Sequence, residues 1–278
     1  MLEAAVRPGP ATCPIEANRT LAHLAVSARL VAGETRLGGL REGGGYRIKF
    51  PAPARGLEAV LVNTGGGLLG GDRLSLDVTA EAGADLMLTT QSAEKVYRAV
   101  AAPAEIELTL KAETGARLHW LPQESILFSG ARLQRQIEAD VAGDAELLIV
   151  ESAVFGRIAM GEVPGIGALA DRWRIRRDGR LAFADDLKLD GQIAQLLDRP
   201  ALGGGARATA SLVLMAPDAE ARLEAARATM ETMGVAAGAS AWDGKLVIRM
   251  LAVDPAPMRQ CLARLIAGLS GRPLPRFW

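Results

Sequence analysis

The stretch LSLDVTAEAGADLMLTTQ (residues 74–91) decides the fold, because a related stretch, IELTLKAETGARLHWLPQ (residues 106–123), follows it in the chain. The alignment pairs residues of the same kind: Leu74 with Ile106, Val78 with Leu110, Glu81 with Glu113, Gly83 with Gly115, Leu86 with Leu118 and Gln91 with Gln123. A third copy spans residues 136–152 and a weaker fourth spans residues 173–185. Units that recur about every 30 residues are typical of stacked repeats.

Each unit has the pattern strand, turn, strand. In the first arm, apolar Leu74, Leu76 and Val78 alternate with polar residues, which is the period of a strand with one buried face. Glycine occupies each turn: Gly83, Gly115, Gly143 and Gly179. A single hairpin cannot bury its apolar face, so we expect stacked β-hairpins in solenoid- or β-helix-like layers. Accidental similarity between ordinary hairpins is the alternative.

The regions on either side of the repeats differ from each other. Residues 23–28 and 46–50 have strand periodicity, and the glycine-rich LGGLREGGG (residues 37–45) predicts a flexible loop between them. After Arg199 the pattern predicts a strand (209–216), a helix (217–233), a hairpin (240–251) and a final helix with an apolar stripe from Met258 to Leu269. We therefore expect a mainly β fold, α+β overall, with a tail (1–20), a β-rich body (21–200) and a small C-terminal α/β portion (201–278).

Charge and hydropathy exclude several classes of protein. The chain has 32 basic and 32 acidic residues, which argues against a protein that gathers nucleic acid through its net charge. The basic run Arg172–Arg177 predicts an exposed strand face with Trp173 and Ile175 turned inward, and binding to an acidic partner is the alternative. No apolar run reaches the roughly 20 residues of a membrane span, and the first residues lack a secretory leader, so we expect a cytoplasmic protein without a membrane partner.

Two cysteines and two histidines are too few and too scattered for a structural zinc site. Cys261 falls on the apolar stripe of the final predicted helix, which predicts a buried, inert thiol. Cys13 precedes a proline in the tail, where it is a weak candidate for contact with a soft metal ion. His23 and His119 stand alone. We expect no tightly bound cofactor, and any metal contact to be transient and largely through carboxylates.

The glycine cluster LVNTGGGLLGGDRLSL (residues 61–76) resembles a nucleotide-binding loop, since Gly65, Gly67 and Gly70 satisfy G-x-G-x-x-G. A dinucleotide site needs a helix directly after the glycines, because the helix N-terminus holds the pyrophosphate. Here an alternating strand follows, so we predict a bend in which the backbone closely approaches another surface. The alternative function is a nucleotide-dependent enzyme that uses the Gly65–Gly71 loop.

The segment TTQSAEKVYRA (residues 89–99) concentrates polar side chains. Lys95 or Tyr97 could act as a catalytic group only if burial shifted its pKa, and neither histidine nor cysteine stands near them in the sequence. An ordered polar loop, hydrogen-bonded to itself or to a partner, is the preferred interpretation.

Three acidic residues stand beside segments that look buried: Asp72, Glu124 and Glu151. Buried charges need partners or water. Pairing with Arg73, Arg98 or Arg132 is one interpretation. The other is a hydrated path for a divalent cation, because oxygen ligands tolerate Ni²⁺ during brief contacts.

Six segments together resemble the urease accessory protein family UreD, also called UreH, and occur in the order of that family: VNTGGGLLGGDRLSL, LTTQSAEKVYRA, WLPQESILFSGARL, VESAVFGRIAMGE, DRWRIRRDGRLAF and the terminal PLPRFW. The resemblance covers about residues 21–278. One departure lies near residues 38–50, where many family members carry a Gly-Pro-Leu-type segment after the first strand.

The resemblance implies a non-catalytic scaffold that assembles with UreF-like and UreG-like partners on apo-urease and assists nickel insertion. It also implies that GTP hydrolysis and high-affinity nickel ligands belong to the partners, and an internal passage through this subunit is a proposed route for nickel in transit. Asp72, Glu124 and Glu151 are then hypothetical lining residues. The candidates for partner binding are Gly70, Gly71, Asp72, Arg73, Thr90, Gln91, Lys95, Tyr97, Arg98 and Gln123. A plain adhesive β-solenoid is a further alternative.

Overall fold

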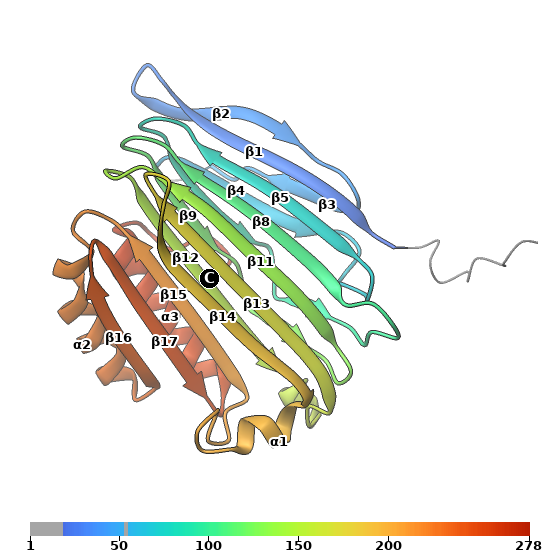
Figure 1. The fold of residues 1–278 in the computed structure, drawn as a ribbon. Coiled ribbons are helices and arrows are strands. Elements are labelled where there is room, and N and C mark those ends of the chain that lie inside the picture. The colour runs from blue at the N-terminus through green and yellow to red at the C-terminus, as the bar shows by residue number, and fades with distance from the viewer. Residues whose placement is uncertain (1–18, 53–54) are drawn as a thin grey trace, which may run out of the picture.

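The computed structural model describes residues 19–52 and 55–278 and consists of two β-sheets packed face to face, with helices on the outer face of the second sheet (Figure 1). The first, sheet A, has the strand order β14 (Arg180–Gln192), β13 (Ile166–Arg177), β11 (Arg132–Val141), β8 (Ala104–Ala112), β5 (Arg73–Ala80), β1 (Leu21–Val31) and β2 (Glu34–Arg41).

The second, sheet B, packs against sheet A and has the strand order β16 (Ala236–Trp242), β17 (Lys245–Ala252), β15 (Ala208–Met215), β12 (Glu146–Phe155), β9 (Arg117–Leu121), β6 (Asp85–Thr90), β4 (Leu57–Asn63) and β3 (Tyr46–Lys49). Two short strands, β7 (Glu94–Val96) and β10 (Ser125–Leu127), pair with each other, and β10 also pairs with β12. The helical elements are η2 (Ile158–Met160), α1 (Ile193–Asp198), η3 (Ala219–Arg222), α2 (Leu223–Met233) and α3 (Pro255–Ser270).

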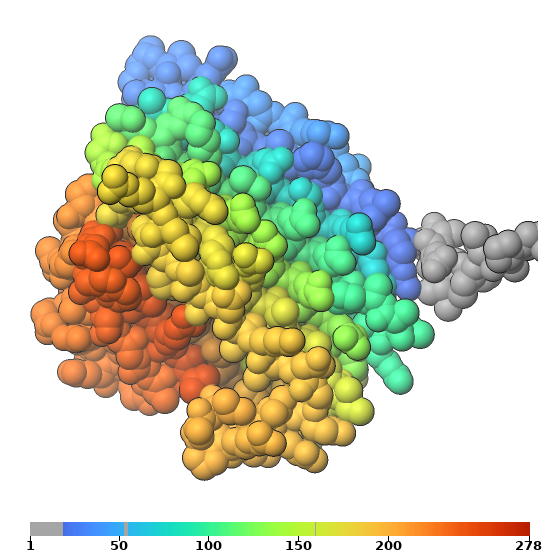
Figure 2. All heavy atoms as spheres, in the orientation of Figure 1, coloured from blue at the N-terminus to red at the C-terminus, as the bar shows by residue number. Residues whose placement is uncertain are grey.

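The repeats stack as the sequence predicts, and the stacked strands are parallel, with a register that matches the sequence alignment. Leu74 lies opposite Ile106 and Leu86 opposite Leu118, which are the pairs of the sequence alignment. Because neighbouring units are stacked, the chain crosses the molecule in order, and the colour in Figure 2 changes steadily from the N-terminal end of the body to the C-terminal end. The fold class predicted from the repeats is therefore confirmed.

The geometry within a unit differs from the prediction. The two arms of each of the first three units do not pair as a hairpin: β5, β8 and β11 lie in sheet A, while β6, β9 and β12 lie in sheet B. Each turn thus carries the chain from one sheet to the other, so the units are arches. The fourth unit is a true hairpin, because β13 and β14 are antiparallel neighbours in sheet A.

Sheet B is covered on both faces, which gives the molecule two cores. Strand β12 is buried along its whole length. Its Leu147 and Ile149 pack in the core between the sheets, whereas Leu148 and Val150 pack in the second core, against the helices. The helix α3 contributes the predicted apolar stripe, from Met258 to Leu269, to this second core. A strand with two buried faces reads as a continuous apolar run, as β12 does.

Three local predictions can be compared with the structure. The flexible loop predicted over residues 37–45 is wrong in its first half, because β2 continues to Arg41 and pairs with β1. The inward orientation of Trp173 and Ile175 is confirmed, since both are buried in the core between the sheets. Among the described residues, no helix combines the length and apolar character needed to span a bilayer.

The stacked core makes a testable prediction at Leu118, which is fully buried between Leu86 and Leu147 in the ladder. Leu118→Ala removes apolar contacts and leaves a cavity that the flanking strands cannot fill, so we expect a loss of about 2–5 kcal/mol in the free energy of unfolding. The matched control is Leu181→Ala on β14, where the leucine is 57% exposed and the expected change is within about 0.5 kcal/mol. Urea titration of the two variants measures both; equal losses would contradict the assignment of the core.

Candidate functional site

A cavity of about 40 Å³ lies between the two sheets. This volume can hold a few water molecules. Its walls are mostly apolar side chains from both sheets, and its charged, hydroxyl and amide side chains come from six residues: Thr90, Glu94, Gln123, Ser125, Arg135 and Glu151. Such a convergence of ionisable groups inside an apolar core marks this cavity as the candidate site.

One side of the cavity is formed by a buried charge trio. The guanidinium of Arg135 on β11 donates hydrogen bonds to Glu151 on β12 and to Asp171 on β13, with Nε 3.1 Å from Asp171 Oδ1. The three side chains are at most 8% exposed. Tryptophan N–H groups complete the trio: Trp120 donates to Glu151 at 2.7 Å and Trp173 donates to Asp171 at 2.9 Å. The trio links the two sheets through hydrogen bonds inside an apolar core.

The trio contains two carboxylates and only one guanidinium. Burial raises the pKa of Glu151 to about 7, although Arg135 acts in the opposite direction. Burial alone would lower the pKa of Arg135, but Asp171 and Glu151 outweigh it and raise that pKa. Arg135 therefore stays charged, and the proton that the trio can take up near neutral pH resides on a carboxylate.

The other side of the cavity carries Glu94, on β7. Asn63 donates a hydrogen bond to it at 2.9 Å, and the hydroxyl of Tyr46 lies 3.4 Å from it and also accepts a bond from Asn63 at 3.0 Å. Burial raises the pKa of Glu94 to about 7, more than these hydrogen bonds lower it. The cavity thus has two carboxylates, Glu94 and Glu151, that both change charge near neutral pH.

The three predicted path carboxylates lie in different surroundings. Glu151 lines the cavity. The carboxylate of Asp72 is buried and accepts hydrogen bonds from the backbone N–H groups of Thr20 at 2.8 Å and Leu69 at 2.7 Å, which fixes the glycine-rich loop. Glu124 follows β9, with Oε1 3.5 Å from Arg259 of α3.

The predicted pairing partners of these acids were wrong. Glu151 pairs with Arg135 and Glu124 with Arg259, whereas Arg73 lies 3.0 Å from Glu105. The broader prediction that these acids pair with arginines agrees with the structure for Glu151 and Glu124.

The glycine-rich loop packs against the segment that follows β7. Leu68 N donates to Lys95 O at 2.7 Å and Tyr97 N donates to Leu68 O at 2.8 Å. A Cβ on Gly67 would lie 2.4 Å from the Tyr97 ring, and one on Gly70 would lie 2.6 Å from Ala102 O. The close backbone approach predicted for the loop is found here, and strand β5 follows it in place of the helix that a dinucleotide needs.

The candidates for partner binding divide into two groups. Thr90, Gln91 and Gln123 lie where β6 and β9 end, and Gln123 N donates to Thr90 Oγ1 at 2.8 Å. The others lie in or beside the glycine-rich loop and the segment after Glu94: Gly70, Gly71, Asp72, Arg73, Lys95, Tyr97 and Arg98. Tyr97 packs edge-on against Phe128, with 5.0 Å between ring centroids, while Lys95 and Arg98 are exposed.

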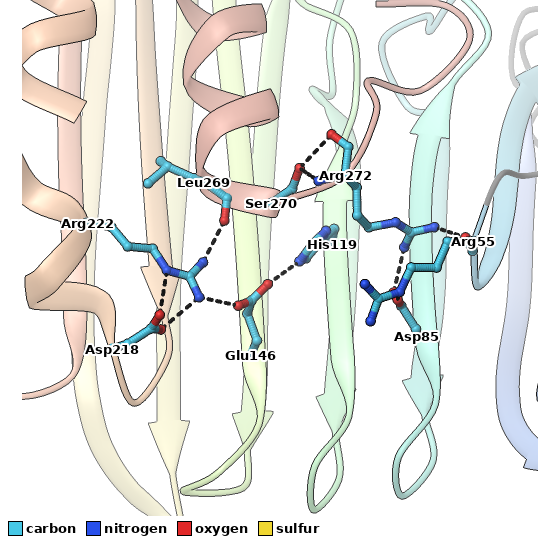
Figure 3. Close-up of polar contacts among 9 residues, drawn as sticks. All are labelled: Arg55, Asp85, His119, Glu146, Asp218, Arg222, Leu269, Ser270 and Arg272. Atoms are coloured by element: carbon cyan, nitrogen blue, oxygen red, sulfur yellow. Dashed lines mark hydrogen bonds and ion pairs between the residues drawn. The ribbon is translucent and has the colours of Figure 1, made fainter. Parts of the chain in front are cut away.

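A second polar cluster lies between sheet B and the helices (Figure 3). Glu146 accepts one hydrogen bond from Arg222 at 2.8 Å and lies 2.8 Å from the fully buried His119. Nearby, Arg272 pairs with Asp85 at 2.5 Å. These contacts anchor η3 and the end of α3 to the sheet, which is a structural role. His119, predicted to stand alone, therefore has a carboxylate partner.

Sequence reasoning missed Arg135, Asp171 and Glu94. The alternation Leu133, Arg135, Ile137 does place Arg135 on the inward face of its strand, so a signal was present. Within the described ranges, no group of three or more His, Cys, Asp or Glu side chains could hold a metal ion. Cys261 is buried as predicted, and burial raises its pKa; Cys13 lies outside the described residues.

The fold and cavity define a class of protein: a stacked two-sheet β protein whose ionisable groups converge on a cavity between the sheets. The family model described as UreD urease accessory protein matches residues 20–278. The chain therefore belongs to the UreD family of urease accessory proteins, as its motifs predicted.

Individual relatives agree. Urease accessory protein UreD 2 of Methylorubrum populi is 52% identical over 250 residues, covering 88% of this chain and 84% of the relative. Urease accessory protein UreD of Methylobacterium sp. strain 4-46 is 48% identical over 267 residues, covering 94% and 95%. That of Xanthobacter autotrophicus is 48% identical over 260 residues, covering 94% and 90%.

The pKa of Glu94 predicts a pH dependence of stability. Because the folded pKa of about 7 lies above the ordinary value of 4.5, the folded state binds the proton more tightly than the unfolded chain. The associated stability is present at low pH and is lost as pH rises from about 4.5 to about 7. Glu94→Gln carries no such proton, so from pH 4.5 to 8 its unfolding free energy should gain about 2–3 kcal/mol relative to the unaltered protein.

Urea titrations at several pH values measure this difference. Glu107→Gln, on the exposed face of β8, is the matched control and should follow the unaltered protein. A constant difference between Glu94→Gln and the unaltered protein at all pH values would contradict the proton-binding role of the half-buried Glu94.

Proposed function

We propose that the chain is a non-catalytic scaffold of urease maturation, which binds UreF-like and UreG-like partners and apo-urease in the cytoplasm and assists nickel insertion. The observation that carries the proposal is the family match over residues 20–278, supported by relatives named urease accessory protein. The ionisable groups of the cavity also favour a scaffold, because Glu151 is paired with Arg135 and Glu94 accepts a hydrogen bond from Asn63, which are contacts that stabilise the fold.

A surface suited to partners lies at the end of sheet A where β5, β8 and β13 begin. The loops before these strands lie together, since Arg73 is opposite Glu105 and Arg132 is opposite Ala168. They expose large apolar side chains: Leu69, Val100, Met160, Val163 and Ile166, of which Val100 is 85% exposed. Clustered apolar side chains at a surface are typical of binding sites between proteins.

The cavity supports a role in nickel transit. Its two carboxylates, Glu94 and Glu151, offer oxygen ligands that change charge near neutral pH, which suits brief contact with a hydrated divalent cation. Of the other two predicted path residues, Glu124 would extend this route outward beside Gln123, whereas Asp72 holds the glycine-rich loop and does not line the cavity.

The scaffold role predicts that charges in the exposed apolar surface block assembly. In cells that co-express urease and its accessory proteins, Val100→Glu combined with Met160→Glu should reduce co-purification of partners and bring urease activity close to that of cells lacking this chain. Val31→Glu is the control, because Val31 is also exposed but lies at the opposite end of β1. Normal urease activation in cells lacking the chain altogether would refute the scaffold role.

The transit role predicts a separate phenotype. Glu94→Gln combined with Glu151→Gln keeps the shape and the hydrogen-bonding reach of both side chains, so the complex should still assemble. Nickel content per purified urease should fall several-fold, while Glu138→Gln on the exposed face of β11 should leave it unchanged. Unchanged nickel content in the double variant would refute the route through this cavity.

A further inference from the structure

Sheet B is interrupted beside the cavity. Strand β6 ends at Thr90 and β7 begins only at Glu94, while its neighbour β9 ends at Leu121 and β10 begins only at Ser125. The two interruptions lie side by side, because Thr89 is opposite Leu121 before them and Glu94 is opposite Ser125 after them. Regular pairing therefore stops and resumes at matching positions along the two neighbouring strands.

The cavity reaches this interruption. Residues on both of its rims, Thr90, Glu94, Gln123 and Ser125, line the cavity. On the other face of sheet B, the interruption is overlain by the last residues of the chain and by α3. Gln123 belongs to both sides: it lines the cavity, and its Nε2 donates to Phe277 O at 2.8 Å.

The last residues are held by side-chain hydrogen bonds and by the packing of Leu274 and Trp278 against the second core. Trp278 Nε1 donates to Leu121 O at 2.8 Å, and Arg259 of α3 donates to Gln123 Oε1 and, at 3.3 Å, to Phe277 O. The guanidinium of Arg259 also lies 6.0 Å from the centroid of the Trp278 ring. All of these groups lie at the interruption, so the terminal segment covers it.

This covering segment lies at the edge of the second core, against which the partly buried Leu274 and Trp278 pack. Arg272 is buried and paired with Asp85, which fixes the chain up to that point. Beyond it, Pro273 and Pro275 have no N–H to donate, and Phe277 is 39% exposed. Release of this chain end breaks a few hydrogen bonds and the edge packing of Leu274 and Trp278, while the buried Arg272–Asp85 pair stays in place.

We propose that Pro273–Trp278 is a detachable cover over an opening that leads through sheet B into the interior cavity, with Gln123 and Arg259 as its latch. When the cover is in place, the cavity is closed on the helix-bearing side. When it lifts, Thr90, Gln123 and Ser125 form a polar mouth through which a small hydrated solute can enter or leave. This goes beyond the proposed function, because it concerns access to the cavity and holds for any small solute.

The test measures how fast a thiol in the cavity reacts. In the full chain with Cys13→Ser and Cys261→Ala, Ser125→Cys places a thiol on the cavity wall, where the native serine is 5% exposed. The probe is the small cationic reagent methanethiosulfonate ethylammonium. Removing Pro275–Trp278, or introducing Trp278→Ala in a chain of full length, should raise its labelling rate about tenfold or more.

The control thiol is Ala139→Cys, in the same core between the sheets but away from the cavity lining, where alanine is 1% exposed. Its labelling should remain slow in all variants. Equal labelling rates at Ser125→Cys with and without the cover, in proteins with unchanged near-UV circular dichroism, would overturn the proposal. So would an equal acceleration at Ala139→Cys, since that indicates general loosening. Neither urease nor nickel enters the measurement, so its outcome is independent of the proposed function.

Discussion

The constraint on which this structure depends is that sheet B has no face toward water over most of its area. Sheet A covers one face and the helices α2 and α3 cover the other, so every side chain of a strand such as β12 is buried. A charged residue on a strand buried on both faces must find its partners inside the protein, because an unpaired buried charge is costly. Glu146 and Glu151, both on β12, show the two solutions: Glu146 pairs toward the helices and Glu151 pairs toward sheet A.

The same constraint explains why both cavity carboxylates have raised pKa values. The groups that hold Glu94 are neutral, an amide and a phenol, and so only partly offset its burial. Glu151 has a cationic partner, but Arg135 is shared with Asp171, which leaves one carboxylate in excess. The protein therefore keeps proton-binding groups in its interior, at some expense of stability near neutral pH. A fold selected for stability alone would place apolar residues of similar volume there.

Much of the fold could be predicted from the sequence because the repeat fixes the register. Once Leu74 is aligned with Ile106 and Leu86 with Leu118, the neighbours in both sheets follow. The distinction between hairpin and arch could not be predicted, since Gly83 and Gly115 at positive φ allow the chain either to return in the same sheet or to cross to the other. Of the site, Glu151 was predicted; Arg135 and Asp171 were missed because a charged residue at an inward position has meaning only when its partner strand is known.

The interruption of sheet B connects the fold with access to the cavity. An unbroken ladder at β6 and β9 would seal the interior with backbone hydrogen bonds, which are satisfied and therefore hard to open. Instead, side chains and the C-terminal end of the chain close the interruption: Gln123 and Arg259 donate hydrogen bonds to the carbonyl of Phe277. Side-chain contacts at a terminus break at far lower free energy than a sheet ladder does. The interior can therefore be reached at this level while the stacked arches on either side keep their pairing.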